Sequence, residues 1–381
     1  MRNPEYVLKS LSEKARNKEY RYERLYRNLY NPEFYLLAYQ NIAKSQGSMT
    51  AGADGQTLDG MSMERIERII AKMKDHSYQP NPARRVYIAK KNSNKKRPLG
   101  IPSTDDKLIQ EIIRMILEAI YEPTFSNNSH GFRPNRSCHT ALKEITTLFT
   151  GAKWIIEGDI KACFDSFDHH VTIELLRKRI KDEAFISLMW KFLRAGYMEQ
   201  WEYHKTYSGS PQGSGMSPIL ANIYLHELDV FMEELKNNFD KGDTRNRKVH
   251  KDHEKVRWAY RKAKSNLEAN RTEENLKAFK EAQKIMLSTP HLNEMDESYK
   301  RVQYNRYADD FLIAVNGSKE DAQSIKEQVR VFLENELKLI MSEEKTHVTH
   351  SSEKVRYLGY DIRVSRSQDT KRTKKGLQRV W

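Results

Sequence analysis

The chain has 381 residues, more than one hydrophobic core usually fills, so two or three subdomains are expected. It carries 66 Lys and Arg against 52 Asp and Glu, and the net charge of +14 indicates a polyanionic partner, either nucleic acid or an acidic membrane surface. The sequence has no apolar run of the roughly 18 residues that a membrane span needs, no apolar secretory signal, and only two cysteines without a CxxC pattern. These features argue against a membrane protein, a zinc ribbon and a disulfide scaffold, and they fit a reducing cytosol.

The positive charge is concentrated in three segments. Residues 1–30, 241–287 and 363–381 carry net charges of +4, +7 and +6, which leaves the rest of the chain at −3. In the first segment aromatic and basic residues alternate: Tyr20, Arg21, Tyr22, Arg24, Tyr26, Arg27 and Tyr30. Rings that stack on bases, beside charges that bind phosphates, are typical of surfaces that hold single-stranded nucleic acid. The same tyrosines could instead pack this segment onto the body of the protein, and both readings could hold.

Periodicity and capping signals predict the elements of the first two thirds of the chain. Apolar residues at spacing i, i+3, i+4 and i+7 predict an amphipathic helix over 63–74. Ser103, three residues before Asp106, resembles a capping box that opens a helix. The other predicted elements are a strand over 86–89, continuation of the Ser103 helix to about Glu122, a strand over 154–160, mainly helical structure over 171–195 and a helix over 218–236.

The composition changes after this last helix. Residues 237–298 are charged and poor in branched apolar residues, which predicts an inserted pair of surface helices with a break near Thr272. Apolar strands on both sides of Ala308-Asp309-Asp310 then predict a β-hairpin over 303–315. An amphipathic helix over 319–339 and a strand over 355–364 follow before a basic tail.

Three carboxylates stand at the ends of predicted strands. Asp309 and Asp310 lie at the tip of the hairpin, and Asp159 ends the strand over 154–160. Carboxylates in a shared site repel one another unless a cation is present, and Mg²⁺ is a hard ion that prefers such oxygen ligands. With the backbone carbonyl of Ile160, these side chains could bind two Mg²⁺ ions about 3.5–4 Å apart, the arrangement used for phosphoryl transfer.

The surroundings of these carboxylates resemble a known family. The box Tyr307-Ala308-Asp309-Asp310-Phe311 is similar to the signature of reverse transcriptases, and the chain resembles the group II intron-encoded type over residues 30–365. Seven blocks occur in the family's order: 96–102 (KRPLGIP), 130–137 (HGFRPNRS), 158–169 (GDIKACFDSFDH), 210–213 with 217–225, the 307–311 box, 344–346 and 357–360. The fourth block departs from the family's usual Pro-Gln-Gly-Gly, because Ser214 occupies the last position.

The resemblance implies an α+β fold with the fingers and palm of a right-hand polymerase. The palm is expected to be an antiparallel sheet with packed helices, and the thumb to be largely absent. The implied domains are an N-terminal helical extension and the start of the fingers (1–80), the fingers (81–153), a first palm segment (154–236), a charged helical insertion (237–302), a second palm segment (303–365) and the basic start of a missing thumb (366–381).

The resemblance also assigns roles to residues. Asp159, Asp309 and Asp310 would be catalytic and, with Ile160, would hold two Mg²⁺ ions, for which Mn²⁺ could substitute. Phe164 would lie beneath the nucleotide sugar and exclude a 2′-hydroxyl, Gln212 would lie along the nucleotide, and Lys90 and Arg97 would neutralise its triphosphate. The expected RNA-binding residues are Tyr20, Arg21, Arg24, Arg27, Arg133 and Arg136.

The implied activity is RNA-directed DNA polymerisation, a nucleotidyltransferase reaction, together with maturase binding of intron RNA for splicing and intron mobility. The alternatives are an RNA-binding splicing cofactor without chemistry of its own and a retron-type reverse transcriptase. The expected partners are intron RNA, an RNA template with a DNA primer, and deoxynucleoside triphosphates. A homodimer is a further option, no membrane partner is expected, and the expected location is the bacterial cytosol.

Overall fold

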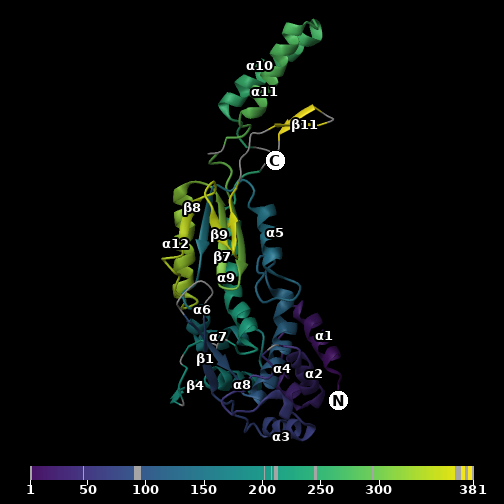
Figure 1. Ribbon diagram of the computed structural model, residues 1–381, viewed down its shortest axis with the longest axis vertical. Coiled ribbons are helices and arrows are strands. Elements are labelled where there is room, and N and C mark those ends of the chain that lie inside the picture. Colours follow the sequence, from purple (N-terminus) through teal and green to yellow (C-terminus); the bar gives the residue numbers. More distant parts are fainter. Residues whose placement is uncertain are drawn as a thin grey trace.

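The computed structural model describes residues 2–45, 47–89, 96–200, 202–206, 208–209, 213–243, 247–293, 296–364, 370–373 and 376–379. The molecule is elongated: the N-terminal helices and a first sheet form one end, a second sheet lies in the middle, and a helical hairpin projects from the other end (Figure 1). Among the helices described, none is long and apolar enough to cross a lipid bilayer.

The N-terminal end is built from short, well-capped helices. Asn3 and Asn31 each accept a hydrogen bond from a backbone N–H of the first turn, and each is followed by proline, which suits the first helical position. The elements are α1 (Pro4–Ala15), η1 (Tyr26–Tyr30), α2 (Pro32–Ala43), η2 (Leu58–Gly60) and α3 (Met63–Lys74). The prediction of a helix over 63–74 is confirmed, and α3 buries the four apolar residues on which it rested.

The first sheet and a central helix form the region predicted as the fingers. Strands β1 (Ala83–Ala89), β2 (Lys96–Ile101), β4 (Tyr197–Glu199) and β5 (Glu202–His204) lie in the order β2-β1-β4-β5. Helix α4 (Thr104–Tyr121) begins at Ser103, whose side chain accepts from the N–H of Asp106, and a turn of 3₁₀ helix, η3 (Glu122–Thr124), follows it. Apolar residues on several faces of α4 are buried, so this helix forms the centre of the fingers core.

The second sheet has the antiparallel order β6-β7-β3-β8 and forms the predicted palm. Its strands are β3 (Trp154–Gly158), β6 (Arg301–Tyr307), β7 (Asp310–Asn316) and β8 (His347–His350). Side chains alternate along β7: Phe311, Ile313 and Val315 join the main core, whereas Leu312 and Ala314 join a second, smaller core on the opposite face. Because both faces are covered, β7 is an almost continuous apolar run.

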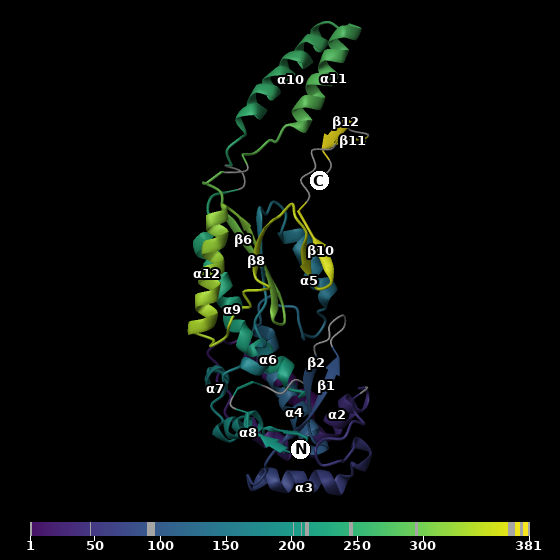
Figure 2. The same ribbon diagram turned by 60° about the vertical axis from the view of Figure 1, so that its left-hand side comes forward.

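Helices cover both faces of the palm sheet (Figures 1 and 2). Helices α9 (Ser217–Phe239) and α12 (Lys319–Asn335) pack on the face of the main core. On the other face lie α5 (Cys138–Leu148) and the small hairpin of β9 (Val355–Tyr357) and β10 (Tyr360–Ile362). The predicted α+β fold with an antiparallel palm is confirmed.

The segment predicted as mainly helical over 171–195 consists of two helices, α7 (His169–Arg177) and α8 (Glu183–Leu193), preceded by the single turn α6 (Cys163–Ser166). The break between α7 and α8 pairs with the N-terminal segment: Tyr22 N–H donates to Arg179 O at 2.9 Å and Lys181 N–H to Tyr22 O at 2.8 Å. Asp182 then caps α8.

The predicted domain boundaries do not separate the two sheets. Strands β4 and β5 belong to the segment 154–236 that was expected in the palm, yet β4 pairs with β1 of the fingers. Helix α5 belongs to the segment 81–153 that was expected in the fingers, yet it packs on the palm. The chain therefore passes from the fingers to the palm and back again before either sheet is complete.

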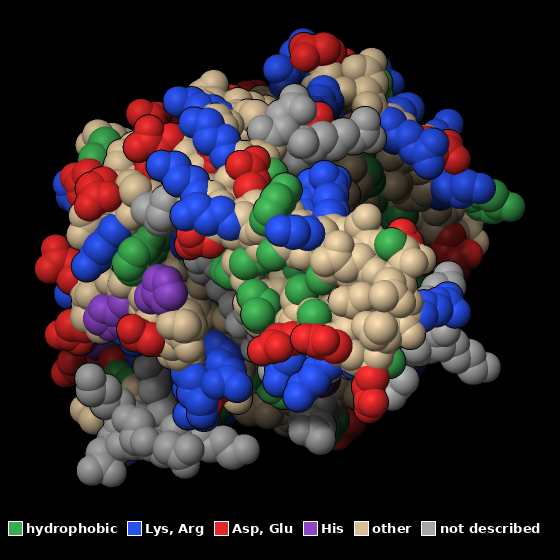
Figure 3. All heavy atoms as spheres, turned by 90° about the horizontal axis from the view of Figure 1, so that it is seen from above, with side chains coloured by type: hydrophobic (Ala, Val, Ile, Leu, Met, Phe, Trp, Pro, Cys, Tyr) green, Lys and Arg blue, Asp and Glu red, His purple; other side chains and the backbone are tan. Residues whose placement is uncertain are grey.

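The insertion forms two long helices, α10 (Lys251–Ala269) and α11 (Glu273–Ser288), as predicted, and Thr272, near which the break was expected, caps the second helix. The hairpin extends away from the palm, near the short strands β11 (Thr370–Thr373) and β12 (Gly376–Arg379) (Figure 2). Viewed from this end, basic and acidic side chains lie side by side rather than in a patch of one sign (Figure 3).

Candidate functional site

The acidic turn is a tight connection between β6 and β7. Tyr307 pairs with Asp310, which leaves only Ala308 and Asp309 between the strands. Ala308 has φ = 57°, in the left-handed region, where a residue with a Cβ costs about 1–2 kcal/mol. The turn therefore needs support from its surroundings.

The strand register brings the third carboxylate to this turn. Gly158, the last residue of β3, pairs with Phe311, so Asp159 follows directly beside Asp310. Gly158 is required at this position, because a Cβ there would lie only 2.1 Å from the Phe311 ring. The predicted meeting of Asp159 with Asp309 and Asp310 is present in the structure.

The carboxylates disturb one another's protonation. Asp310 is exposed at the surface, but partial removal of its carboxylate from water, followed by the charges of Asp309 and Asp159, raises its pKa to about 7. Burial and the charge of Asp159 raise the pKa of Asp309, while Lys345 and Arg97 act in the opposite direction. The site therefore carries more negative charge than it can hold at neutral pH without a cation.

Lys345 supplies part of the positive charge that the site needs. Its ammonium group lies 2.7 Å from Asp159 Oδ2, and the hydrogen bond to Asp159 raises the pKa of Lys345. Within the described residues, no three His, Cys, Asp or Glu side chains are arranged to hold a metal ion. Ile160 pairs with Met341 through two backbone hydrogen bonds, from Ser342 N–H to Asp159 O and from Lys161 N–H to Ile340 O. Neither bond uses the carbonyl oxygen of Ile160, which is the proposed metal ligand.

A buried ion pair lies next to the acidic turn and stabilises it. Arg306 and Asp229 are both 0% exposed, and the guanidinium donates to the two carboxylate oxygens at 2.7 and 2.6 Å. Burial alone would raise the pKa of Asp229, but the charge and hydrogen bonds of Arg306 bring it below its usual value. Arg306 Nη1 also donates to Ala308 O at 2.9 Å. The pair therefore fixes the backbone of the acidic turn.

The loop that carries the second sequence block lies directly against the same turn. A Cβ on Gly131 would lie 2.4 Å from Ala308 N, so only glycine permits this approach. Asn222 of α9 donates to Gly131 O at 2.8 Å, and His130 N–H donates to Arg306 O at 2.8 Å. Three separate segments thus hold the carboxylates in place.

Two of the four predicted nucleotide-binding residues are described. Arg97 is exposed on β2, and its charge acts on Asp309. Phe164 is half-buried on α6, with its ring 6.0 Å from that of Phe132 and 5.9 Å from that of Phe167. Lys90 and Gln212 lie outside the described residues.

The bend after Gln212 is described, and it approaches the fingers closely. Gly213 has φ = 104°, and a Cβ on it would lie 2.6 Å from Gly100 O. Ser214, the departure from the family pattern, donates its hydroxyl to Gln110 Oε1 of α4 at 2.9 Å. The serine therefore ties this bend to the centre of the fingers.

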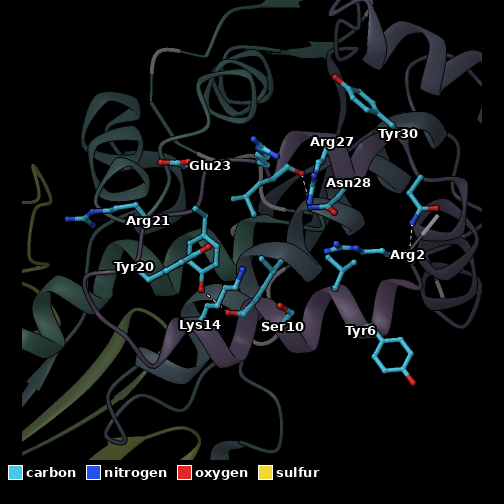
Figure 4. Close-up of a pocket in the computed structure, with 16 residues that line it drawn as sticks. Arg2, Tyr6, Ser10, Lys14, Tyr20, Arg21, Glu23, Arg27, Asn28 and Tyr30 are labelled. Atoms are coloured by element: carbon cyan, nitrogen blue, oxygen red, sulfur yellow. Dashed lines mark hydrogen bonds between the residues drawn. The ribbon is translucent and has the colours of Figure 1, made fainter.

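The basic and aromatic N-terminal segment borders a groove of about 700 Å³ between α1 and η1 (Figure 4). Tyr22 and Tyr26 are buried, which confirms that part of the aromatic series packs the segment onto the body. Arg24 and Arg27 are exposed, Arg21 is partly exposed, and all three line the groove. Tyr20 lies beside Lys14, whose Nζ is 5.2 Å from the ring centre.

The other two predicted RNA-binding arginines differ in their surroundings. Arg133 is buried, and its Nε, Nη1 and Nη2 atoms donate to Glu122 and to the carbonyls of Ser126 and Ser129. This geometry gives Arg133 a structural role and does not support RNA contact by its side chain. Arg136 is half-buried and donates to Asn127.

Comparison with known proteins agrees with this geometry. Residues 88–243 and 286–362 match the family model described as reverse transcriptase (RNA-dependent DNA polymerase). The chain is 51% identical over 359 residues to the group II intron-encoded protein LtrA of Lactococcus lactis subsp. cremoris, covering 94% of this chain and 60% of that protein. It is 43% identical to an uncharacterized 91 kDa protein in the cob intron of Schizosaccharomyces pombe, covering 90% of this chain and 42% of that protein. It is also 33% identical to the protein YkfC of Escherichia coli, covering 91% of this chain and 85% of that protein.

The chain belongs to the reverse transcriptase family. The predicted resemblance to the group II intron-encoded members is confirmed by its identity to the Lactococcus protein, of which it spans 60%.

Sequence reasoning assigned no role to three residues of the site. Lys345 belongs to the sixth block and pairs with Asp159, whereas Arg306 of β6 and Asp229 of α9 form a buried pair outside the positions to which a role was assigned. Strand β6 (RVQYNRY) is mostly polar in sequence, so nothing in its pattern distinguishes Arg306 as buried; its burial follows from the partner Asp229, because a buried charge needs one.

Proposed function

We propose that the chain catalyses RNA-templated DNA synthesis, in which a primer 3′-hydroxyl attacks the α-phosphate of a deoxynucleotide and pyrophosphate leaves. The supporting observation is the convergence of Asp159, Asp309 and Asp310 on one turn, where their charges oppose one another. Exposed Arg97 stands near enough to act on Asp309, as a residue that binds a triphosphate should.

The proposal includes two divalent metal ions, Mg²⁺ or its substitute Mn²⁺. Carboxylate oxygens are the ligands that Mg²⁺ prefers, and an excess of negative charge favours its binding. The proposed ligands are Asp159, Asp309 and Asp310, with the carbonyl of Ile160, and binding would have to draw the carboxylates into a metal-holding arrangement that they do not have in the described structure. When bound, the ions would stabilise the attacking and leaving oxygens. The protein's own part is to hold the carboxylates in register through β3 and β7, and to keep the turn fixed through Arg306.

The remaining predicted nucleotide contacts belong to the same proposal. Phe164 would exclude a ribonucleotide 2′-hydroxyl, Gln212 would lie along the nucleotide, and Lys90 and Arg97 would bind the triphosphate. The preferred substrates are therefore deoxynucleoside triphosphates on an RNA template with a DNA primer. The expected location is the bacterial cytosol, and a homodimer is a further option.

Primer extension tests the polymerase proposal. The chain should extend a DNA primer on an RNA template when deoxynucleotides and Mg²⁺ are present, and synthesis should stop in EDTA and resume after Mg²⁺ is restored. A template-free reaction serves as the control. Absence of extension under all metal conditions would leave RNA binding without chemistry as the better account.

We further propose that the protein binds intron RNA and assists splicing and intron mobility. This proposal is supported by the basic groove beside α1, where three arginines accompany tyrosine rings, and by the identity to a group II intron-encoded protein. The groove lies in the N-terminal part of the fingers and contains no carboxylate of the acidic turn. Substitutions in the groove can therefore test RNA binding separately from DNA synthesis.

A salt series tests the groove. Intron RNA affinity should fall linearly in log salt with a slope of about 0.7–0.9 per neutralised phosphate, and replacing Arg21, Arg24 and Arg27 with Ala should flatten that slope. The charge-matched control replaces Lys277, Lys280 and Lys284 of α11 with Ala. If the α11 variant flattens the slope and the groove variant does not, the RNA surface lies on the hairpin.

A further inference from the structure

Phe132 is a large apolar side chain in an unexpected place. It is 51% exposed, whereas its neighbours His130, Gly131 and Arg133 are buried. Its backbone has φ = 57°, a left-handed conformation that is unusual for a bulky residue and worth a functional explanation.

The loop holds this conformation rigidly. On one side, His130 and Gly131 are bonded to Arg306 and Asn222. On the other side, the Arg133 guanidinium is fixed by Glu122 and two backbone carbonyls. These contacts fix the backbone on both sides of Phe132, so its ring is held at the surface.

The ring of Phe132 faces the proposed sugar-contacting residue. The rings of Phe132 and Phe164 meet edge to face, with centroids 6.0 Å apart and an interplanar angle of 80°. On its inner side Phe164 meets the buried Phe167, whose ring in turn lies 4.6 Å from that of Tyr224. Phe164 thus stands between a ring that is part of the core and a ring held on the surface.

We propose that Phe132 is a positioning residue for sugar selection, which holds the Phe164 ring in the place where it excludes a 2′-hydroxyl. The inference rests on the proposed polymerase function and on the proposed role of Phe164. A ring can reject an added hydroxyl only if it cannot move aside, and α6 is a single turn that gives Phe164 little restraint of its own. Phe167 restrains the ring from behind and Phe132 restrains it from the exposed side.

The test is a double-mutant cycle in the full chain. The ratio of kcat/KM for a deoxynucleotide to that for the matching ribonucleotide is measured for wild type, Phe132→Leu, Phe164→Val and the double variant. Phe132→Leu should lower the ratio about two- to tenfold, the range expected for one edge-to-face pair. Phe164→Val should lower it further, and the double variant should equal Phe164→Val, because Phe132 then has no ring to hold.

Each departure from this pattern has a definite meaning. An unchanged ratio in Phe132→Leu, or losses that add independently in the double variant, would overturn the positioning role while leaving the role of Phe164 intact. An unchanged ratio in Phe164→Val would overturn the sugar-contacting role itself and this inference with it. Tyr203→Leu, which removes a 50% exposed ring on β5, is the matched control and should leave the ratio unchanged.

Discussion

Replacing Asp309 with Asn is expected to lower DNA synthesis by at least about 100-fold, since even residues that only orient metal ligands contribute 10–100-fold. The fold should survive the change. Burial and the charge of Asp159 raise the pKa of Asp309, so the ionised carboxylate is a burden to the metal-free protein, and the unfolding midpoint should hold or rise. Single-turnover primer extension and urea unfolding measure the two effects.

Asp361→Asn is the control, because it removes an exposed carboxylate of β10 that forms a surface ion pair with Lys354 at 3.4 Å. It should change neither quantity. Full activity in Asp309→Asn would show that the Asp309 carboxylate is not needed for the reaction. Loss of the fold in this variant would show that the carboxylate has a structural role.

The same site should give stability a pH signature. The pKa of Asp310 is raised from 3.8 to about 7, so the folded protein holds a proton that the unfolded chain has released. Metal-free stability therefore falls as the pH rises through this window. On this basis, the stability of Asp310→Asn relative to wild type should increase as the pH rises from about 5 to about 8. A difference that is constant across this range would contradict the carboxylate coupling.

Breaking the buried ion pair under the turn should have the largest effect on stability. Asp229→Ala leaves Arg306 charged, unpaired and fully buried, and the loss of one partner of such a pair costs about 3–5 kcal/mol. Urea unfolding should show this drop, and activity should fall with it. The surface pair of Arg177 and Glu183 provides the control, and Glu183→Gln should hardly change the unfolding midpoint.

A second variant separates positioning from stability. In Arg306→Met with Asp229→Leu, apolar side chains replace both charges, and such replacements are often neutral or stabilising. Much of the lost stability should return. Activity should not, because Ala308 O loses the Nη1 donor that lies 2.9 Å away in the native protein. Recovery of both quantities would show that the pair serves stability alone.

The sequence predicted the local elements well where short-range signals decide them. The cap at Ser103, the helix break near Thr272, the apolar face of α3 and the hairpin around Ala308 and Asp309 all depend on residues a few positions apart. The approach of Asp159 to that hairpin was predicted from its place at the end of an apolar strand, and the register of β3 against β7 brings Asp159 beside the hairpin.

What escaped prediction depends on contacts between distant segments. The break between α7 and α8 contains no proline or glycine, and it is explained by its pairing with Tyr22 from the N-terminal segment. Arg306 meets Asp229 across 77 positions, and Lys345 meets Asp159 across 186. Arg133 looked like a surface charge in a basic motif, but its partner Glu122 draws it into the interior.

The base of the α10–α11 hairpin has a consequence for how this chain can vary. Lys241 and Lys300 exchange backbone hydrogen bonds of 3.0 and 3.2 Å, so the intervening segment leaves the palm and returns at nearly the same point. The family match omits residues 244–285, which contain α10 and most of α11. Closing a longer loop across such a base adds little entropic cost, about 0.6 kcal/mol for each doubling of length. A change in the length of the insertion should therefore leave the spacing of β6 and β7, the strands that carry the acidic turn, unchanged.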